Sequence, residues 1–351
     1  MSTLLFILPF LIVYSIVVIY AERKLSAFMQ DRLGPMEVGP YGLLQTVADL
    51  LKLLQKEEIV PAKAELWLFK AAPLLIFVAV FAGFAVLPLS PSWSGSSIST
   101  GLFFLLAIVS MDVIGILMAG WSSNNKYSVL GAMRAAAQLI SYEVPLGLSV
   151  LCVVIVTQTL DLQAICFQQG THSHIPSYLL GIKALGQTNT WGGFFTWNVF
   201  RMPLLFFAWI IFFISSLAES NRTPFDLPEA EAEIVAGFQT EYSGFRWGII
   251  MLAEYAMMLL VSLLGTILFF GGWNTPFPNI GSTLLLADWT TGPVWGIFWM
   301  ILKAFLLVIT QIWVRWSLPR LRVDQLMSLS WKYLTPISLI LIILCGFWKL
   351  F

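Results

Sequence analysis

The sequence predicts an all-α polytopic membrane protein, and two observations carry this prediction. The 351 residues are 58% hydrophobic and only 11% charged, which is far from the balance of a soluble globular domain. Apolar runs of about 20 residues, the length that a helix needs to cross the hydrocarbon layer of a bilayer, recur along the chain. We therefore expect a single membrane domain that covers residues 1–351.

Eight runs have the length and composition of a spanning helix. They cover approximately residues 2–21, 71–90, 101–121, 135–157, 198–218, 247–270, 294–315 and 333–350. The first run has no charged residue before it and no small-residue cleavage pattern after it, so we expect a retained helix and not a signal peptide. Because the number of spans is even, both termini are expected on one side.

The basic residues indicate which side that is. Most of them lie in segments 22–70, 122–134, 219–246 and 316–332, whereas the opposite loops hold little beyond Lys183. Positive charge favours the cytoplasmic side of a membrane. The four segments are therefore expected on the inner side, and both termini and the long loop 157–197 on the outer, periplasmic side.

The first inner segment contains a helical pattern that is too short to span. From residue 41 to 56, Gln45, Asp49, Lys52 and Lys56 recur at spacings of four, three and four, which places one polar stripe on a leucine-rich helix. Such a helix is expected to lie in the membrane interface or to cover a partner.

Four charged residues fall well inside the predicted spans: Asp112, Glu143, Glu254 and Lys303. A charge at the bilayer centre costs from about 2.5 to more than 10 kcal/mol, so each needs a partner, a polar cavity or a bound or lost proton. Glu143 and Glu254 are each expected roughly 10–12 Å below the inner surface. Pro145 is expected to break the helix that carries Glu143. Asp112 and Lys303 either neutralise each other or take part in transport.

The third inner segment holds the densest acidic stretch, ESNRTPFDLPEAEAE, from Glu219 to Glu233. Asp226 followed by Glu229 has capping-box spacing, so we expect a helix there with Asp226, Glu229 and Glu233 on one face. Like charges at this spacing repel, and we expect some of these acids to hold a proton near neutrality, which suits proton handling. The alternative is a solvated acidic face.

No motif for a redox group or a metal accompanies these acids. The sequence has no Walker loop, no GxGxxG after a strand, no GxSxG and no CxxC, and its three cysteines are too few and too far apart for a metal site or a disulfide framework. We therefore expect no metal site and no bound cofactor on this chain.

Long motifs in the inner segments resemble one known family, the respiratory complex I membrane subunit that is called ND1 in mitochondria and the H subunit in bacteria. The third inner loop of that family is similar to ESNRTPFDLPEAEAEIVAGFQTEYSG, and its first inner loop to AERKLSAFMQDRLGPMEVGPYGLLQTVADLLKLLQKE. GAMRAAAQLISYEVPLG resembles its fourth span and AEY, at residues 253–255, its sixth. The resemblance covers most of the chain.

The resemblance implies a subunit of a proton-pumping NADH:quinone oxidoreductase, a translocase of the respiratory chain, without a redox centre of its own. Such a subunit forms much of the chamber in which quinone is reduced by an iron-sulfur cluster on a neighbouring peripheral subunit, and its acids link the chamber to proton translocation. Its partners are the other complex I subunits, quinone and the lipid bilayer, and no nucleic acid. The long loop 157–197 and PEAEAE favour a bacterial inner membrane over a mitochondrial one.

The family's functional positions map onto two sets of residues. For the proton path they are Glu143, Glu219, Asp226, Glu229, Glu231, Glu233, Glu241 and Glu254. For the quinone chamber they are Arg23, Arg32, Asp49, Arg222 and Phe225, with Arg222 as the expected counter-charge of the loop acids. Asp112 and Lys303 lie outside the matching motifs.

Three other interpretations remain open at the level of sequence. They are the related anchor subunit of a membrane-bound hydrogenase, an independent ion transporter, and a passive anchor for a peripheral enzyme. A transporter normally contains paired broken helices from inverted repeats, and no such pair is apparent in the sequence.

Overall fold

The computed structural model describes residues 2–95, 98–170, 178, 191–227, 234–279 and 286–350. Within these residues seven helical segments are long and apolar enough to cross a membrane, which confirms the predicted all-α polytopic class. They are Phe6–Met29, Leu66–Val86, Gly101–Ser122, Lys126–Thr157, Gly244–Phe269, Pro293–Ser317 and Val323–Lys349. The predicted span 198–218 is shorter than expected, because α8 (Asn198–Arg201) ends before Pro203 and the apolar helix α9 covers only Pro203–Glu219.

The spanning segments are not all single helices. α1 (Ser2–Met29), α6 (Lys126–Thr157), α11 (Gly244–Phe269) and α13 (Pro293–Ser317) are continuous. α3 (Leu66–Gly83) ends in the 3-10 turn η2 (Phe84–Val86), and α4 (Gly101–Val109) meets α5 (Met111–Ser122) at Ser110. The last segment consists of α14 (Val323–Ser328), a π-helical turn η8 (Leu329–Leu334) and α15 (Thr335–Leu350).

Shorter elements connect them. On the inner segments these are the 3-10 turn η1 (Pro40–Gly42), α2 (Gln45–Gln55) and the 3-10 turn η7 (Gly237–Gln239). On the other connections they are the hairpin β1 (Pro88–Ser90) and β2 (Trp93–Ser94), α7 (Leu162–Gln168), η6 (Gly193–Thr196) and α12 (Leu286–Trp289). The amphipathic helix expected at residues 41–56 is therefore present as α2.

Two local expectations about α6 are wrong. The segment 122–134 was expected to be an inner loop, yet α6 begins at Lys126, where the Asn125 side chain accepts a hydrogen bond from the Tyr127 backbone N–H at 3.0 Å. Pro145 does not break the helix, which runs on to Thr157. A proline removes only one backbone donor, and neighbouring helices in a bundle can satisfy the acceptor that it leaves.

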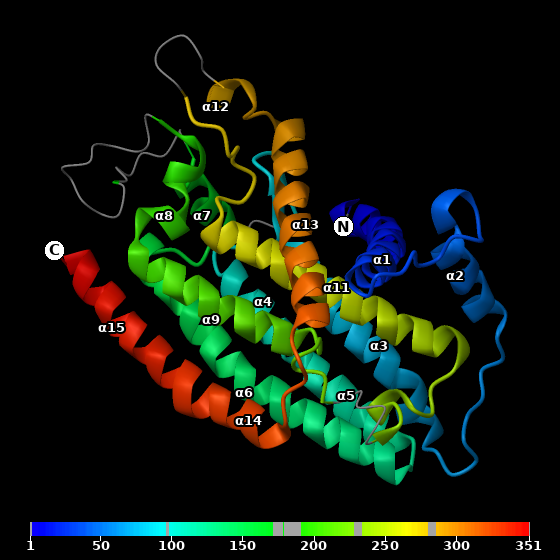
Figure 1. Cartoon of the computed structure of the whole chain (residues 1–351). Coiled ribbons are helices and arrows are strands. Elements are labelled where there is room, and N and C mark those ends of the chain that lie inside the picture. Colours follow the sequence, from blue (N-terminus) through cyan, green and yellow to red (C-terminus); the bar gives the residue numbers. More distant parts are fainter. Residues whose placement is uncertain are drawn as a thin grey trace.

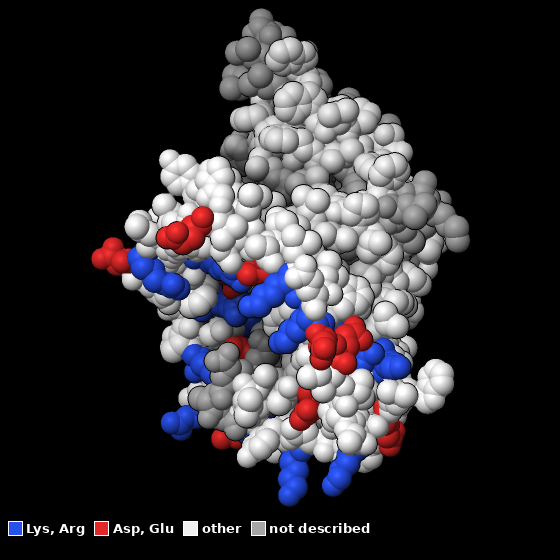
Figure 2. Space-filling view, turned by 90° about the vertical axis from the view of Figure 1, so that its right-hand side faces the viewer, with Lys and Arg blue, Asp and Glu red and all other residues white. Residues whose placement is uncertain are grey.

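Helix α11 forms the centre of the bundle (Figure 1) and packs against α1, α3, α9 and α13. On one side of it α9, α6 and α15 run next to one another, and α3 packs on α5 and α11. Charged side chains gather over one half of the face drawn in Figure 2. This segregation agrees with the predicted inner and outer segments, although the side on which the termini lie stays a prediction.

Candidate functional site: a row of carboxyl groups inside the bundle

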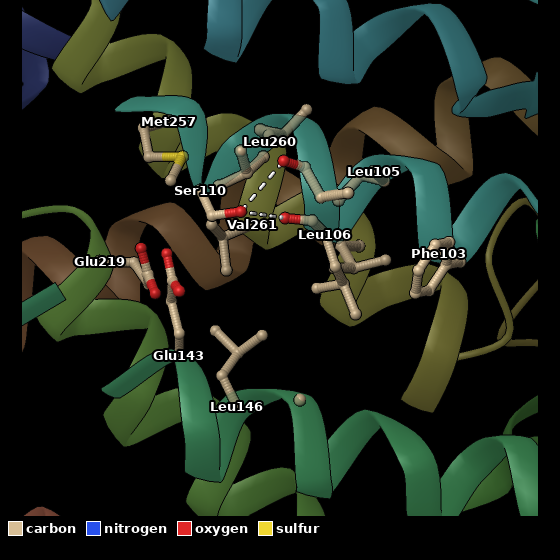
Figure 3. Close-up of a pocket in the computed structure, with 14 residues that line it drawn as sticks. Phe103, Leu105, Leu106, Ser110, Glu143, Leu146, Glu219, Met257, Leu260 and Val261 are labelled. Carbon is tan, nitrogen blue, oxygen red and sulfur yellow. Dashed lines mark hydrogen bonds between the residues drawn. The ribbon is translucent and has the colours of Figure 1, made fainter. Parts of the chain in front are cut away.

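Four acids, of which Asp112 and Glu219 are buried and Glu143 and Glu254 half-buried, line two adjoining cavities inside the bundle. The first cavity, of about 290 Å³, is lined by Glu143 from α6 and Glu219 from the end of α9. Their carboxyl groups lie side by side and face the cavity (Figure 3), with Ser110 opposite them. The remaining wall is apolar, from residues such as Leu106, Leu146, Met257, Leu260 and Val261. Two acids therefore share an otherwise apolar space.

The second cavity is much smaller, about 10 Å³, and adjoins the first. Asp112 from α5 and Glu254 from α11 line it, together with Glu219 and Met257, which line both cavities. Glu219 is only 5% exposed and shares one cavity with Glu143 and the other with Asp112. We call Asp112, Glu143, Glu219 and Glu254 the carboxyl row.

The local helix geometry explains why these acids converge. Ser110 ends α4, and its hydroxyl donates back to the carbonyls of Leu106 (3.3 Å) and Ala107 (3.0 Å), as Figure 3 shows. The break at Ser110 is followed at once by α5, whose first turn carries Asp112. Asp112 and Glu219 thus reach the same cavity from different helices.

The carboxyl row costs the fold stability. One carboxyl oxygen of Asp112 and one of Glu143 are buried and have no hydrogen-bond partner within the described part of the chain. Glu254 accepts a hydrogen bond from the Gln239 side chain of η7 at 2.6 Å, which ties the row to the third inner segment. Buried acceptors without donors cost free energy, and ionised acids that line the same small cavity repel each other unless they hold protons. Such a row is therefore suited to taking up and passing on protons.

A second buried cluster lies between α1, α11 and α13. Glu22 of α1 is hydrogen-bonded by Arg315 of α13 and accepts a hydrogen bond from the Tyr255 hydroxyl of α11 at 2.7 Å. Arg222 lies 3.8 Å from the same carboxylate, with its guanidinium 4.4 Å from the centre of the Tyr255 ring. The charges here are paired, in contrast to the carboxyl row.

The sequence reasoning missed Glu22, Tyr255 and Arg315. Glu22 directly follows the predicted span 2–21, and α1 continues about two turns beyond it, so an acid at the edge of an apolar run was the available signal. Arg222, expected to balance the loop acids, lies beside Glu22 and Tyr255. The acids Glu229, Glu231 and Glu233, and the helix predicted for them, lie outside the described residues.

The other predicted positions are spread over the inner segments. The Arg23 guanidinium and the Asp49 carboxylate lie 2.5 Å apart and link α1 to α2. Arg32 is exposed, and its side chain donates a hydrogen bond to the Gln30 side chain. Phe225 is buried against Tyr142 of α6, and the Asp226 carbonyl accepts a hydrogen bond from Arg320. Glu241 accepts a hydrogen bond from the Asn125 side chain at 2.6 Å, at the start of α6.

The suggested pairing of Asp112 with Lys303 is wrong. The Lys303 ammonium donates to three backbone carbonyls at or just beyond the end of α11, those of Phe270 (2.8 Å), Gly272 (2.9 Å) and Asn274 (2.5 Å). It also lies 4.4 Å from the centre of the Trp197 ring. Lys303 therefore completes the C-terminal end of a helix, where a cation is favoured, and Asp112 belongs to the carboxyl row.

A bundle of apolar helices long enough to span a membrane, with ionisable groups that face an interior cavity, is typical of a polytopic membrane protein with a candidate functional site among its helices. The chain belongs to the NADH dehydrogenase family, whose model matches residues 1–346. This confirms the resemblance drawn from the loop motifs.

Curated relatives are similar to this chain over nearly its full length. One of them, an NADH-quinone oxidoreductase H subunit of Cytophaga hutchinsonii that carries the number 2 in its name, is 57% identical over 360 aligned residues, which cover 99% of this chain and 98% of the relative. The NADH-quinone oxidoreductase H subunit of Chlorobium luteolum is 50% identical, covering 99% of this chain and 87% of the relative. The corresponding protein of Chlorobaculum parvum is 50% identical over 98% of this chain and 90% of its own length.

Proposed function

We propose that this chain is the membrane subunit of a proton-pumping NADH:quinone oxidoreductase, and that its carboxyl row links quinone reduction to proton translocation. The observation that carries the proposal is the pair of adjoining cavities that share Glu219. An acid that faces both spaces can exchange a proton with Glu143 on one side and with Asp112 and Glu254 on the other. The names of the relatives, each a subunit of an NADH-quinone oxidoreductase, support the same assignment.

The quinone-binding end of this path is proposed at the inner segments. Arg23 and Asp49 join α1 to α2, and Arg222 and Phe225 lie in the segment that follows Glu219. Arg32 and the acids Asp226, Glu229, Glu231, Glu233 and Glu241 are proposed to lie near the same chamber. A charge that appears on quinone during reduction would then act on Glu219 through a low-dielectric interior.

The assembly follows from this role. The electrons come from an iron-sulfur cluster on a peripheral subunit that we propose as a direct partner, and small membrane subunits continue the proton path. We place the complex in the bacterial cell inner membrane. Moving one charge against the membrane potential costs about 2.3 kcal/mol per 100 mV, so the path must be driven by the redox step.

The test is Glu219→Gln in the assembled complex, reconstituted in liposomes. Quinone reduction is followed by NADH absorbance and proton uptake by quenching of a pH-sensitive dye. We expect both to fall about tenfold, equivalent to ~1.4 kcal/mol on the barrier, because glutamine keeps the shape and removes the exchangeable proton. Glu65→Gln, an exposed acid at the start of α3, is the matched control and is expected to behave as the parent. Proton uptake at the parent level in the Glu219 variant would rule out this role for the row.

A further inference from the structure

Helix α6 contains a backbone carbonyl that its own sequence leaves without a helical donor. In a regular helix the Ser141 carbonyl accepts the N–H of residue 145, but residue 145 is Pro145 and has no N–H. The Ser330 hydroxyl donates to this carbonyl at 2.5 Å, and Ser330 is fully buried. The hydrogen bond that the proline removes is thus replaced from another segment of the chain.

The donor is presented by an unusual element. Ser330 lies in the π-helical turn Leu329–Leu334, and its own carbonyl accepts a hydrogen bond from the Thr335 hydroxyl at 2.9 Å. The next residue, Trp331, donates its indole N–H to the Ser141 hydroxyl at 3.3 Å. Single π-turns within helices are uncommon and occur frequently at functional sites. Two successive residues of this turn therefore contact the same residue of α6.

A second proline-containing helix beside the carboxyl row has the same arrangement. Pro73 lies inside α3 and leaves the Phe69 carbonyl without its helical donor, and the Tyr242 hydroxyl donates to that carbonyl at 3.2 Å. The Tyr242 and Phe69 rings stack with centres 4.2 Å apart. Burial raises the pKa of Tyr242 to about 12, against the opposing effects of Ser122 and Arg246, so the hydroxyl keeps the proton that it donates. The recurrence indicates that these contacts are a feature of the fold at the row.

We propose that Ser330 is a positioning residue for Glu143. Residues two apart on a helix point about 200° apart, so the face of α6 that carries Pro145 and the Ser141 carbonyl is turned away from the face that carries Glu143. A proline removes a backbone hydrogen bond and kinks the helix at its own face. The angle of this kink sets the position of side chains on the opposite face. By closing the gap at Ser141, Ser330 sets where Glu143 lies relative to Glu219 in the first cavity. The inference rests on the proposed function only for its consequence in proton transfer.

The first test measures the surroundings of Glu143 directly. The assembled complex in membranes is treated with dicyclohexylcarbodiimide, which modifies protonated carboxyl groups in apolar surroundings, and the labelling rate at Glu143 is measured by mass spectrometry. A single neutral hydrogen bond changes an equilibrium modestly, so we expect Ser330→Ala to change this rate about fivefold. Ser330→Thr, which keeps the hydroxyl, is expected to restore the parent rate.

The matched control is Ser338→Ala. Ser338 is also fully buried in the last helical segment, but its hydroxyl donates to Thr335 of its own helix at 2.7 Å. It is expected to leave the labelling rate unchanged. An unchanged rate in Ser330→Ala, or the same change in Ser338→Ala, overturns the proposal.

A double-mutant cycle isolates the contact from general damage. Pro145→Ala returns a backbone N–H to the Ser141 carbonyl, so the Ser330 hydroxyl becomes dispensable there. We expect Ser330→Ala to change Glu143 labelling about fivefold in the parent and by less than about twofold in the Pro145→Ala background. If Ser330→Ala alone does not assemble, the double variant is expected to assemble. Equal effects in both backgrounds contradict the proposal.

The consequence for function is measured separately. Ser330→Ala is expected to lower the protons translocated per NADH oxidised, with Ser330→Thr restoring them. If Glu143 labelling changes while that ratio stays at the parent value, the positioning role stands and the proposed proton path through Glu143 fails. If labelling stays constant, the positioning role fails whatever the outcome for pumping.

Discussion

The carboxyl row and Lys303 are both ionisable sites inside the helical bundle, and their hydrogen bonding differs. The three protons of the Lys303 ammonium are all matched by backbone carbonyls, whereas Asp112 and Glu143 each have a buried carboxyl oxygen with no partner in the described residues. Removing a buried charge whose hydrogen bonds are all satisfied leaves its partners unsatisfied, whereas a group that is itself short of partners has a cost that needs another reason. The comparison separates a structural charge from a functional one.

Replacing the structural charge is expected to have the largest effect. Lys303→Met leaves three backbone carbonyls, at least two of them buried, without their donor, and at about 1–3 kcal/mol each the total reaches about 3 kcal/mol or more. We expect little assembled complex in the membrane, measured by native gel electrophoresis at equal expression. Lys70→Met, at an exposed position of α3, is the control. Normal assembly with impaired pumping in the Lys303 variant would show that Lys303 has a functional role. It would contradict the division between a structural Lys303 and a functional carboxyl row.

Replacing a member of the carboxyl row is expected to leave assembly intact and to impair proton uptake. Asp112→Asn keeps the volume, introduces an N–H that can satisfy its neighbours, and removes the carboxyl proton. We expect normal assembly and proton uptake lowered about fivefold, or ~1 kcal/mol on the barrier. Asp112→Leu, which removes the polar group as well, is expected to lower uptake further. Lost assembly in Asp112→Asn would place Asp112 with Lys303 as a structural residue.

The smallest effect is expected at the exposed ion pair of α1 and α2. Arg23 and Asp49 are close, but their side chains are 43% and 37% exposed, so the pair contributes less than about 1 kcal/mol to stability. We expect Arg23→Gln to leave assembly intact and, because the pair is proposed to border the quinone entrance, to raise the KM for quinone roughly two- to threefold. Quinone kinetics at several salt concentrations provide the measurement. A KM for quinone equal to that of the parent at low salt would contradict the proposal that Arg23 borders the quinone chamber.

Much of the fold was predictable because it depends on local composition. A helix needs only its own backbone to satisfy its hydrogen bonds in a bilayer, so hydropathy alone located seven spanning segments close to their observed positions. Errors arose where a neighbour intervenes. Pro145 was expected to break its helix, and Ser330, from a segment far along the chain, supplies the donor for the carbonyl that the proline leaves unpaired in α6.

The site was predictable in part for the same reason. Glu143 and Glu254 stand out because a carboxylate within an apolar run is costly wherever the helix lies. Asp112 and Lys303 stand out equally, yet their roles could not be separated, because hydropathy does not tell which helices face each other. Glu22 was overlooked since it lies next to the charged end of α1 and its two arginine neighbours come from α13 and the segment after α9.

The sequence by itself determined the membrane class, the spanning segments, and the family through its loop motifs. It also determined which few acids lie within apolar runs, where a carboxylate is costly. Only the tertiary structure decided which of those charges meet. Partnership between side chains on different helices depends on crossing, rotation and register, and these are set by packing across the whole bundle and not by any one segment. That packing gave Lys303 three carbonyls, placed Glu219 between two cavities, and left Asp112 and Glu143 with carboxyl oxygens that no group in the described part of the chain satisfies.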